Sequence, residues 1–368
     1  MVPTLLAIVS TTLAIWMLLT TILNSVTIRR LKNLDQNLIT NNISARVSIL
    51  IPMRNEALNA KASAESALAQ RLLGNFEVLV RNDQSNDDTG LILNRIKDSR
   101  LSIQSGDELP AGWLGKNYAL DRLVAAATGD YLVFLDADVR LEKSAIASSI
   151  ALMESLQLDY ISPYPKQLVN DLGSGIVQPL LQWSWFATLP VRLTERSLRG
   201  STVVANGQFF IVRRDAYLAC GGHAKIKNEV IEDIELARLL RGSGYFGTVV
   251  DGSRIATCLM YQNFVELLNG YSKSQWRAFG NPFQTLSVVA LLFISSIYPA
   301  IFAAQGEIWA LWSYLALVCS RFITAQKTDS VRWSSLFHPI SALIWISLIF
   351  RSWNLKRLGK LNWRGRML

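Results

Sequence analysis

The sequence predicts an α/β domain with transmembrane helices on both sides of it. Three observations lead to this fold class. Residues 46–262 alternate between short apolar runs and helical stretches, which is the pattern of a sheet with crossover helices. The 368 residues are 50% hydrophobic, with a mean hydropathy of +0.23. Long apolar segments lie near both ends. Part of the chain is therefore expected in lipid and part in water.

The N-terminal segment is predicted to be a membrane anchor within residues 1–30. Residues 4–23 carry no charge, and about 20 apolar residues can cross a hydrocarbon core as a helix. A cleaved signal peptide has its basic residues before the apolar stretch, whereas Arg29, Arg30 and Lys32 follow it here. By the positive-inside rule, the N-terminus points outward and the domain that follows is cytoplasmic.

Three apolar segments occupy the predicted C-terminal membrane region, 285–350: residues 285–304, 308–323 and 334–350. Three spans after a cytoplasmic domain would leave the basic tail 351–368 outside, although basic tails prefer the cytoplasm. We expect the third segment to be re-entrant or interfacial, because it is short and contains His338-Pro339. Arg321, near the end of the second segment, is the competing weak point.

The remaining composition limits the possible chemistry. The formal net charge of +9 does not indicate nucleic-acid binding, because the excess basic residues lie beside the apolar segments, where anionic lipid attracts them. Cys220, Cys258 and Cys319 have no metal-site spacing. Only two histidines are present, so carboxylates must carry any acid–base chemistry.

Strands and helices are predicted to alternate in the first half of the domain. The predicted strands are residues 47–51, 76–80, 101–103 and 131–135, and the predicted helices are 60–70, 88–97 and 115–127. The strands are short and rich in branched residues. The second helix begins with acidic residues, which suit the positive end of a helix dipole. This order predicts neighbouring parallel strands joined by helices.

Two aspartates follow the last of these strands, in the run Y-L-V-F-L-D-A-D-V at 131–139. In open α/β sheets, ligands bind beyond the carboxyl ends of the strands, and Mg²⁺ or Mn²⁺ binds through one or two carboxylates and substrate phosphates. Asp136 and Asp138 are therefore predicted metal ligands. The alternative is a strand that ends in an ordinary polar turn.

Polar residues also follow the first two strands, as a nucleotide requires. Arg54, Asn55 and Glu56 follow the first strand, and residues 82–89 follow the second. The alternative for the second cluster is a turn and helix cap. Lys116, at the start of a helix, can meet a phosphate beside free backbone N–H groups, or it can be a solvated surface lysine.

Together these residues resemble the family 2 glycosyltransferases. The matching stretches are S-I-L-I-P-M-R-N-E at 48–56, E-V-L-V-R-N-D-Q-S-N-D-D-T at 77–89, G-W-L-G-K-N-Y-A at 112–119 and G-D-Y-L-V-F-L-D-A-D at 129–138. The resemblance covers about residues 46–282, and G-W-L-G-K is most similar to membrane-bound members that act on carotenoid or hopanoid lipids. It implies a GT-A fold, a mixed sheet with flanking helices.

The resemblance also implies roles for individual residues on the donor side. Those assigned to the nucleoside pocket are Pro52, Asn55, Glu56 and Asp83. Lys116 would approach the diphosphate, and Asp138, assisted by Asp136, would hold Mg²⁺ or Mn²⁺. Asn82 stands where the family usually has aspartate, so uracil recognition would depend mainly on Asp83.

On the acceptor side, the stretch 205–214, which contains Gly207, is expected to be a strand beneath the sugar. Glu232 and Asp233 open an amphipathic helix. The resemblance places this pair where the acceptor arrives, with Asp233 as the general base. The alternative is acidity that only complements the helix dipole. Without a nucleophilic serine or cysteine arrangement, a single displacement that inverts the anomeric centre is expected.

Two stretches indicate a lipid acceptor. Residues 179–199 mix tryptophan, leucine and arginine as expected of a segment in the headgroup layer, and residues 263–284 are predicted to form an interfacial helix. Gln275, Trp276 and Arg277 are predicted to bind substrate. Their order departs from the Gln-X-X-Arg-Trp of processive relatives, so transfer of a single sugar is expected.

The sequence thus predicts transfer of a hexose, from UDP-hexose, to a hydroxyl or carboxyl group of a membrane lipid such as a carotenoid or other terpenoid. One alternative is a polyprenyl-phosphate or sphingolipid-type glycosyltransferase. Another is a non-catalytic membrane scaffold that keeps a nucleotide-binding domain.

Overall fold

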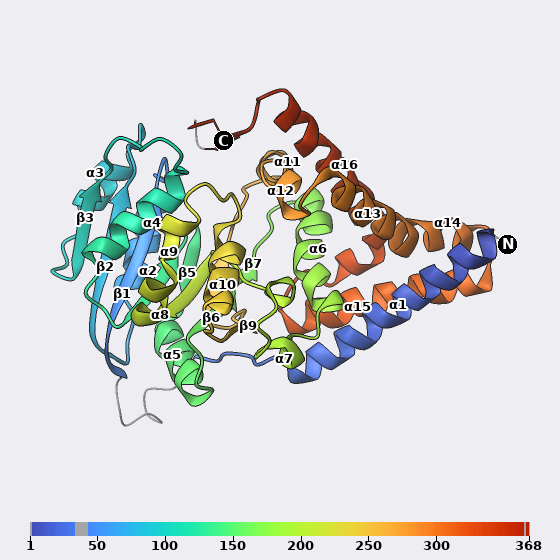
Figure 1. Cartoon of the computed structure of the whole chain (residues 1–368), viewed down its shortest axis with the longest axis horizontal. Helices are drawn as coiled ribbons and strands as arrows, with labels where there is room; N and C mark the ends of the chain where they lie inside the picture. Colours follow the sequence, from blue (N-terminus) through green and yellow to red (C-terminus); the bar gives the residue numbers. More distant parts are fainter. Residues whose placement is uncertain (1, 34–42, 364–365, 368) are drawn as a thin grey trace. The chain divides into compact units, whose positions relative to one another are not determined.

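The computed structural model describes residues 2–33, 43–363 and 366–367, and the chain divides into two compact units (Figure 1). The sheet unit comprises Arg29–Lys166 and Leu193–Cys258. The helical unit comprises Met1–Ile28, Gln167–Arg192 and Leu259–Leu368. The expected domain 46–262 is therefore interrupted, because residues 167–192 pack with the helical unit.

A seven-stranded mixed sheet organises the sheet unit, in the order β3-β2-β1-β4-β8-β6-β9. Its strands are β1 (Ile43–Met53), β2 (Leu73–Asn82), β3 (Leu101–Ser105), β4 (Tyr131–Leu135), β6 (Tyr160–Tyr164), β8 (Phe209–Arg213) and β9 (Gly247–Asp251). The first four are parallel, as predicted. The short strands β5 (Val139–Leu141) and β10 (Ala256–Cys258) pair separately, and β7 (Lys166–Gln167) lies at the unit boundary.

Helices flank this sheet (Figure 1). They are α2 (Ala60–Leu68), α3 (Thr89–Asn94), α4 (Gly115–Ala126), α5 (Ala145–Ser155), α8 (Arg214–Cys220), α9 (Gly222–Lys225) and α10 (Glu232–Gly242), and η1 (Gly200–Thr202) is a single 3₁₀ turn. Residues of α4, α8 and α10 share one buried cluster with Phe134 of β4 and Phe210 of β8. This packing fixes the first turns of α4 and α10 above the same part of the sheet.

Strand β8 runs antiparallel to both of its neighbours, β4 and β6. Its first residue, Phe209, pairs with Leu135, the last residue of β4. The strand expected over 205–214 therefore begins later, and residues 205–208 form the turn that leads into it. Because β8 is antiparallel, this turn lies beside Asp136, at the carboxyl end of β4.

The segment after the N-terminal helix is fastened to the sheet unit. Arg29 forms an ion pair with Glu195 at 2.7 Å, and Arg30 pairs with the buried Asp251. The backbone of Asp251 also bonds to Arg29 and Leu31. Two of the three basic residues that we expected to face headgroups are thus neutralised inside the protein, whereas Lys32 is exposed. The predicted orientation of the first helix stays a prediction.

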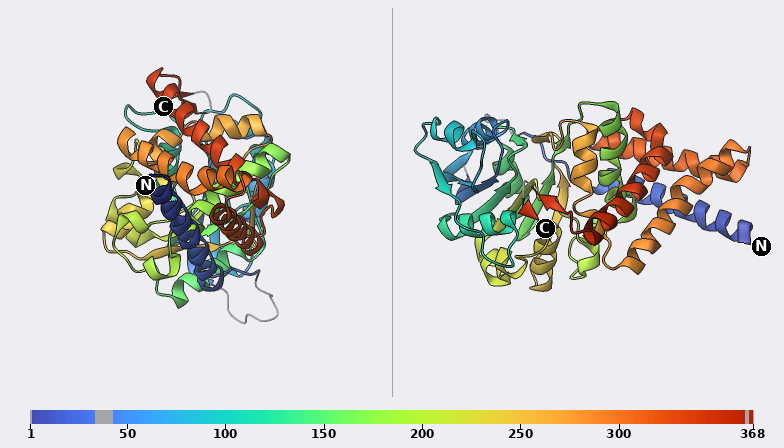
Figure 2. Two further views of the ribbon diagram at one scale, coloured as in Figure 1. Left: turned by 90° about the vertical axis from the view of Figure 1, so that its right-hand side faces the viewer. Right: turned by 90° about the horizontal axis from the view of Figure 1, so that it is seen from above.

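In the described part of the chain, ten helical segments build the helical unit, together with part of α7 (Val191–Thr194). They are α1 (Val2–Thr27), α6 (Leu172–Thr188), α11 (Phe264–Tyr271), α12 (Gln275–Ala278), α13 (Pro282–Leu292), the π-helix η2 (Phe293–Ile297), α14 (Tyr298–Ala304), α15 (Ile308–Lys327), the 3₁₀ helix η3 (Trp333–Phe337) and α16 (His338–Arg357). Figure 2 shows α1 as one uninterrupted helix.

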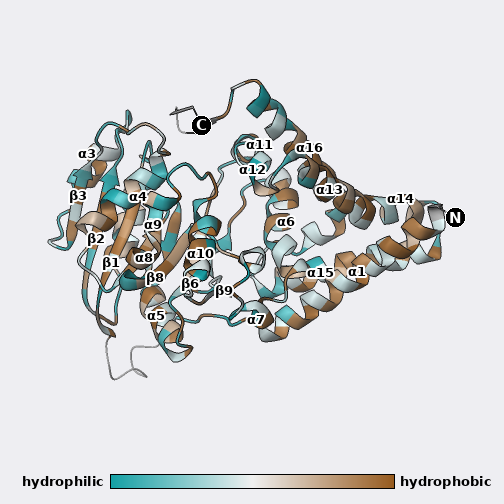
Figure 3. Cartoon of the chain, in the orientation of Figure 1, coloured by the Kyte–Doolittle hydropathy of each residue, from teal (hydrophilic) through white to brown (hydrophobic). Residues whose placement is uncertain are grey.

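Among the residues that the structure describes, four helical stretches are long and apolar enough to cross a membrane: Thr4–Thr27, Pro282–Ala304, Ile308–Lys327 and Trp333–Arg357. Figure 3 shows apolar residues along α1, α13, α14 and α15. The last stretch has 25 residues, so its length does not support our expectation that it is too short to span. Pro339 lies in the first turn of α16, where no backbone N–H is needed. Whether this stretch is re-entrant stays a prediction.

Buried contacts of α6 correct the expectation that residues 179–199 lie in the headgroup layer. Leu180, Trp183 and Phe186 are each at most 3% exposed. The Trp183 indole donates a hydrogen bond to Ser320 Oγ of α15 over 2.7 Å. These side chains are helix-to-helix packing residues, and only the end of the stretch, with Arg192, Arg196 and Arg199, is exposed.

One other expectation for the helical unit changes. Residues 263–284 form two short helices, α11 and α12, and the start of α13, where we expected one interfacial helix. The basic tail continues α16 to Arg357 and then forms the small hairpin β11 (Asn362–Trp363) and β12 (Arg366–Met367). Arg364 of the tail lies outside the described residues.

Candidate active site

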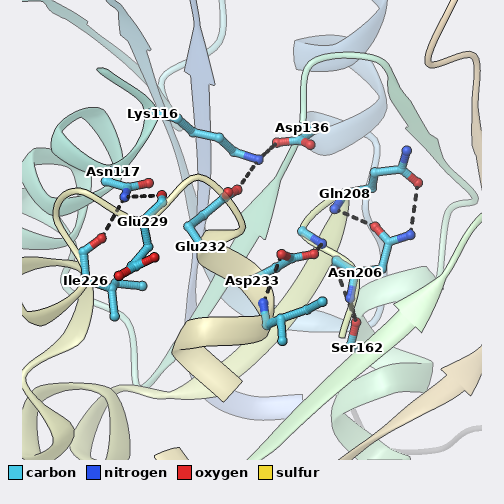
Figure 4. Close-up of polar contacts among 12 residues, drawn as sticks. Lys116, Asn117, Asp136, Ser162, Asn206, Gln208, Ile226, Glu229, Glu232 and Asp233 are labelled. Carbon is cyan, nitrogen blue, oxygen red and sulfur yellow. Dashed lines mark hydrogen bonds and ion pairs between the residues drawn. The ribbon is translucent and has the colours of Figure 1, made fainter. Parts of the chain in front are cut away.

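Lys116 joins two carboxylates that come from different parts of the sheet unit. Its Nζ lies 2.7 Å from Asp136 Oδ1, at the end of β4, and 2.6 Å from Glu232 Oε1, in the first turn of α10 (Figure 4). Burial alone lowers the pKa of the Lys116 ammonium, but the two ion pairs outweigh it and raise the pKa. Lys116 is therefore charged and is not a solvated surface lysine.

Asn117, which we did not predict, places Glu232 near Lys116. Its side chain is 1% exposed and donates hydrogen bonds to the carbonyl oxygens of Ile226, over 2.8 Å, and Glu229, over 3.0 Å. The backbone N–H of Leu114 also donates to the carbonyl of Lys227. The loop before α10 is thus held against the start of α4. The only sequence signal was the position of Asn117 beside the predicted phosphate-binding lysine.

The turn before β8 holds Asp136 from the other side. The Asp136 N–H donates to the Gln208 carbonyl over 3.0 Å. The turn is braced internally, because Asn206 Oδ1 accepts the Gln208 N–H over 2.8 Å and Ser162 Oγ accepts the Asn206 N–H over 2.8 Å (Figure 4). Asp136 and Gly207 therefore belong to one rigid corner of the site.

Asp233 accepts two backbone hydrogen bonds, from Gly207 over 2.7 Å and from Ile234 over 2.9 Å. Burial raises the pKa of the Asp233 carboxyl to about 7, and the neighbouring Glu232 charge acts in the same direction. A carboxylate with a pKa near 7 can accept a proton from a reacting hydroxyl at neutral pH. Asp233 also lies in the first turn of α10, so acidity that only complements the helix dipole stays the alternative, and Asp233 as the general base stays a prediction.

Asp138 carries the observation that fits a bound cation. Its Oδ1 is shielded from solvent and has no hydrogen-bond partner among the residues that the structure describes. Burial, together with the charges of Asp136 and Glu56, raises the pKa of the Asp138 carboxyl to about 7. Within the described ranges no three His, Cys, Asp or Glu side chains form a metal cluster. Two carboxylates completed by ligand phosphates suit Mg²⁺ or Mn²⁺.

The residues expected to bind the nucleoside meet at the ends of β1 and β2. Asn55 has a positive φ of 53° and bonds to Ser85 and Asn86, each of which follows β2. Pro52 lies near the end of β1, opposite Arg81 of β2. These contacts bring the first two polar motifs together, as predicted from the sheet order.

Asp83 and Glu56 complete this group. Asp83 is 3% exposed, and its N–H donates to the carbonyl of Met53. The Glu56 N–H donates to Thr89 Oγ1 over 2.8 Å. Asp87 accepts from both the N–H and the hydroxyl of Thr89, so for these two residues the turn-and-cap interpretation is the one that the contacts favour.

Gln275, Trp276 and Arg277 belong to the helical unit and stay predictions as substrate-binding residues. Gln275 is 4% exposed. The Trp276 N–H donates to Ser352 Oγ, and the Lys356 ammonium lies 3.7 Å from the Trp276 ring centroid. These contacts anchor α12 on α16.

His223 has a structural environment. It is 1% exposed and its Nδ1 lies 2.7 Å from the Tyr217 hydroxyl. Burial lowers the pKa of its imidazole to about 3, so the ring is neutral at physiological pH. The titrating groups of the site are therefore its carboxylates.

The chain is similar to known proteins by family model, by sequence and by fold. Residues 48–220 match the family model Glycosyl transferase family 2. The 4,4'-diaponeurosporenoate glycosyltransferases of Staphylococcus aureus strains MRSA252 and bovine RF122 are 25% and 24% identical over 342 residues, which cover 87% of this chain and 87% of each relative. Among solved structures, the fold is similar to the mannosyltransferase PcManGT of Pyrobaculum calidifontis in complex with GDP-Man and Mn²⁺, with a TM-score of 0.57. The two sequences are 15% identical, and the alignment covers 96% of this chain and 99% of that one. The predicted GT-A-like mixed α/β fold is confirmed.

Proposed function

We propose that this chain transfers one sugar from a nucleotide sugar to a membrane lipid and inverts the anomeric centre. The premise is that the chain is a glycosyltransferase with a family 2 domain at residues 48–220. The single observation that carries the proposal is the bridge from Asp136 through Lys116 to Glu232. It joins a donor-side carboxylate at the sheet edge to the helix that carries the proposed base, Asp233.

The donor is proposed to be a nucleoside diphosphate hexose, with UDP-hexose as the first choice. Its nucleoside would contact Pro52, Asn55, Glu56 and Asp83, beside the ends of β1 and β2. Mg²⁺ or Mn²⁺ would be held by Asp138 and Asp136 and would supply positive charge to the departing diphosphate. The Mn²⁺ and GDP-Man in the P. calidifontis structure support a metal of this kind and make GDP-sugars the second donor class to test.

Lys116 supplies a second positive charge for the diphosphate. It is the second residue of α4, so its ammonium adds to the free N–H groups of the helix N-terminus. As the sugar–phosphate bond breaks, negative charge grows on the diphosphate, and a positioned cation stabilises that charge. The ion pair with Glu232 limits where the ammonium can move.

Asp233 is proposed to accept the proton of an acceptor hydroxyl. The acceptor oxygen forms a bond to the anomeric carbon, the bond from that carbon to the diphosphate breaks, and the hydroxyl proton passes to Asp233. A carboxylate acceptor has no proton to give. The S. aureus relatives are named for diaponeurosporenoate, a carotenoid carboxylate, so both acceptor types belong in the test.

The four apolar helices associate the chain with a membrane. We place the sheet unit on the cytoplasmic side, where nucleotide sugars are made and where Lys32, after α1, and the basic residues after α16 are favoured. A lipid acceptor then needs to enter only from the adjoining leaflet.

Two experiments test this proposal. In the first, the purified protein is given lipid extracts and a panel of UDP- and GDP-sugars with a labelled hexose, and transfer of the label to lipid is measured. In the second, mass spectrometry compares the lipids of cells that contain the protein with those of cells that lack it. Label in a terpenoid fraction supports the proposal, and label in polyprenyl phosphates or sphingolipids supports the rival acceptors. No labelled lipid with any donor would favour the non-catalytic scaffold.

A further inference from the structure

We infer that Lys116 is an internal counter-ion that occupies Asp136 in the nucleotide-free site, so that a divalent cation binds weakly until a nucleotide diphosphate draws the ammonium away. The inference rests on the proposed function and deepens it, because it assigns an order and a coupling to cation and donor binding. Neither follows from the presence of two aspartates alone.

The geometry of the ion pairs supports the first half of this inference. The ammonium lies 2.7 Å from Asp136 Oδ1, which is hydrogen-bond distance to one of the two carboxylate oxygens that could bind a cation. The side chains of Lys116 and Asp136 are only 22% and 27% exposed, so solvent screens this pair less than a surface pair. A cation that approaches Asp136 therefore competes with a charged partner for this carboxylate.

The position of Lys116 supports the second half. It is in the first turn of the 12-residue helix α4, whose backbone N–H groups favour an anion. A diphosphate at this end offers the ammonium new oxygen partners, while Glu232, 2.6 Å away, can stay bound on the other side. Asp136 is then released for the cation. By thermodynamic linkage, the nucleotide strengthens cation binding and the cation strengthens nucleotide binding by the same factor.

The experiment measures binding of Mn²⁺ to the full chain in detergent by electron paramagnetic resonance, with and without UDP or GDP. For the wild type, the nucleotide is expected to lower the Kd for Mn²⁺ by at least about fivefold, the lower end of ordinary coupling. In Lys116→Met, Mn²⁺ alone should bind about tenfold more tightly than to the wild type. The nucleotide should lower the Kd for Mn²⁺ by a smaller factor than in the wild type, because only the direct contact between the cation and the phosphates remains.

Two variants separate a displaced ion pair from a general charge effect. Arg140→Gln removes an equal charge near Asp138, but the Arg140 guanidinium bonds to the Ala137 carbonyl and to Asn59 Oδ1. We expect it to change the Kd for Mn²⁺ alone by less than about twofold, because it frees no oxygen of Asp136. Lys116→Arg keeps the cation and should keep weak binding of Mn²⁺ alone.

The outcomes are distinguishable. Unchanged Mn²⁺ binding in Lys116→Met, or an equal gain in Arg140→Gln, with nucleotide binding intact in the wild type, overturns the inference and leaves the proposed function standing. A wild-type protein that binds neither UDP nor GDP at any Mn²⁺ concentration overturns both. Far-UV circular dichroism of each variant confirms that the fold is retained.

Discussion

The backbone N–H of Gly207 donates a hydrogen bond to Asp233 Oδ2 over 2.7 Å. This contact joins the turn before β8 to the first turn of α10. The same turn accepts the Asp136 N–H through Gln208. One short stretch of backbone therefore positions both the donor-side carboxylate, Asp136, and the acceptor-side carboxylate, Asp233. Its smallest residue, Gly207, lies between them.

Gly207→Ala should lower kcat about 10- to 100-fold, because a small displacement of a catalytic group is costly. A β-carbon at this position would lie 3.2 Å from Glu232 Oε1 and 3.2 Å from Asp233 Cβ, so one of the two side chains must shift. Gly242→Ala, at the other end of α10, meets no atom within 4 Å and is the matched control, with activity near that of the wild type. Equal activity of the two variants would show that the spacing between Gly207 and the side chains of Glu232 and Asp233 does not affect catalysis.

The pH profile reports on Asp233. Its folded-state pKa is raised to about 7, so the carboxyl is protonated and cannot act as a base below this pH. With a hydroxyl acceptor, kcat/KM should rise about tenfold per pH unit below pH 7 and level off above it. Glu232 and Lys116 face the same carboxyl, so Glu232→Gln should move the midpoint to lower pH. A profile flat from pH 5 to 8 contradicts a titrating base and is the result expected for a carboxylate acceptor.

Asn117→Ala should lower both stability and activity. It leaves the carbonyls of Ile226 and Glu229 without this donor, at a cost of about 1–3 kcal/mol in the free energy of unfolding. The freed loop carries Glu232, so kcat should fall more than nucleotide affinity does. Urea unfolding and steady-state kinetics measure both effects. The exposed Asn94→Ala is the control, and equal losses in the two variants would remove the positioning role.

Local patterns in the sequence predicted the first half of the sheet unit well. The strand expected at 131–135 has these bounds in the structure, and the helix expected at 115–127 ends one residue earlier. Such elements are short, continuous in sequence and bounded by Gly or polar residues, so their limits are local properties. Asp136 and Asp138 follow directly from the end of such a strand.

What the sequence did not predict depends on non-local contacts. The role of Asn117 requires the carbonyls of a loop more than 100 residues later in the chain. The assignment of α6 to the helical unit depends on contacts such as Trp183 with Ser320 of α15. An aromatic and basic composition fits both a segment in the headgroup layer and a helix-packing face. Only the residues that the side chains contact in the folded chain decide between the two.

The side of the membrane on which the chain ends can be measured by cysteine labelling. In a Cys319→Ser background, Lys32→Cys and Lys360→Cys should react with an impermeant maleimide only after cells are permeabilised, because their basic surroundings favour the cytoplasm. Gly306→Cys, between α14 and α15, should react in intact cells. Reaction of Lys360→Cys in intact cells would mean that Trp333–Arg357 spans fully.

The most direct test of the central claim compares Asp233→Asn with the wild type in transfer of a labelled hexose to lipid. Asparagine keeps an oxygen for the Gly207 N–H but cannot accept the proton, so with a hydroxyl acceptor the rate should fall about 10²- to 10⁴-fold. Binding of Mn²⁺ and nucleotide should stay within about twofold of the wild type, because Asp233 contacts neither in this account. With a hydroxyl acceptor, an Asp233→Asn protein that keeps a third or more of the wild-type rate contradicts the role of Asp233 as the base.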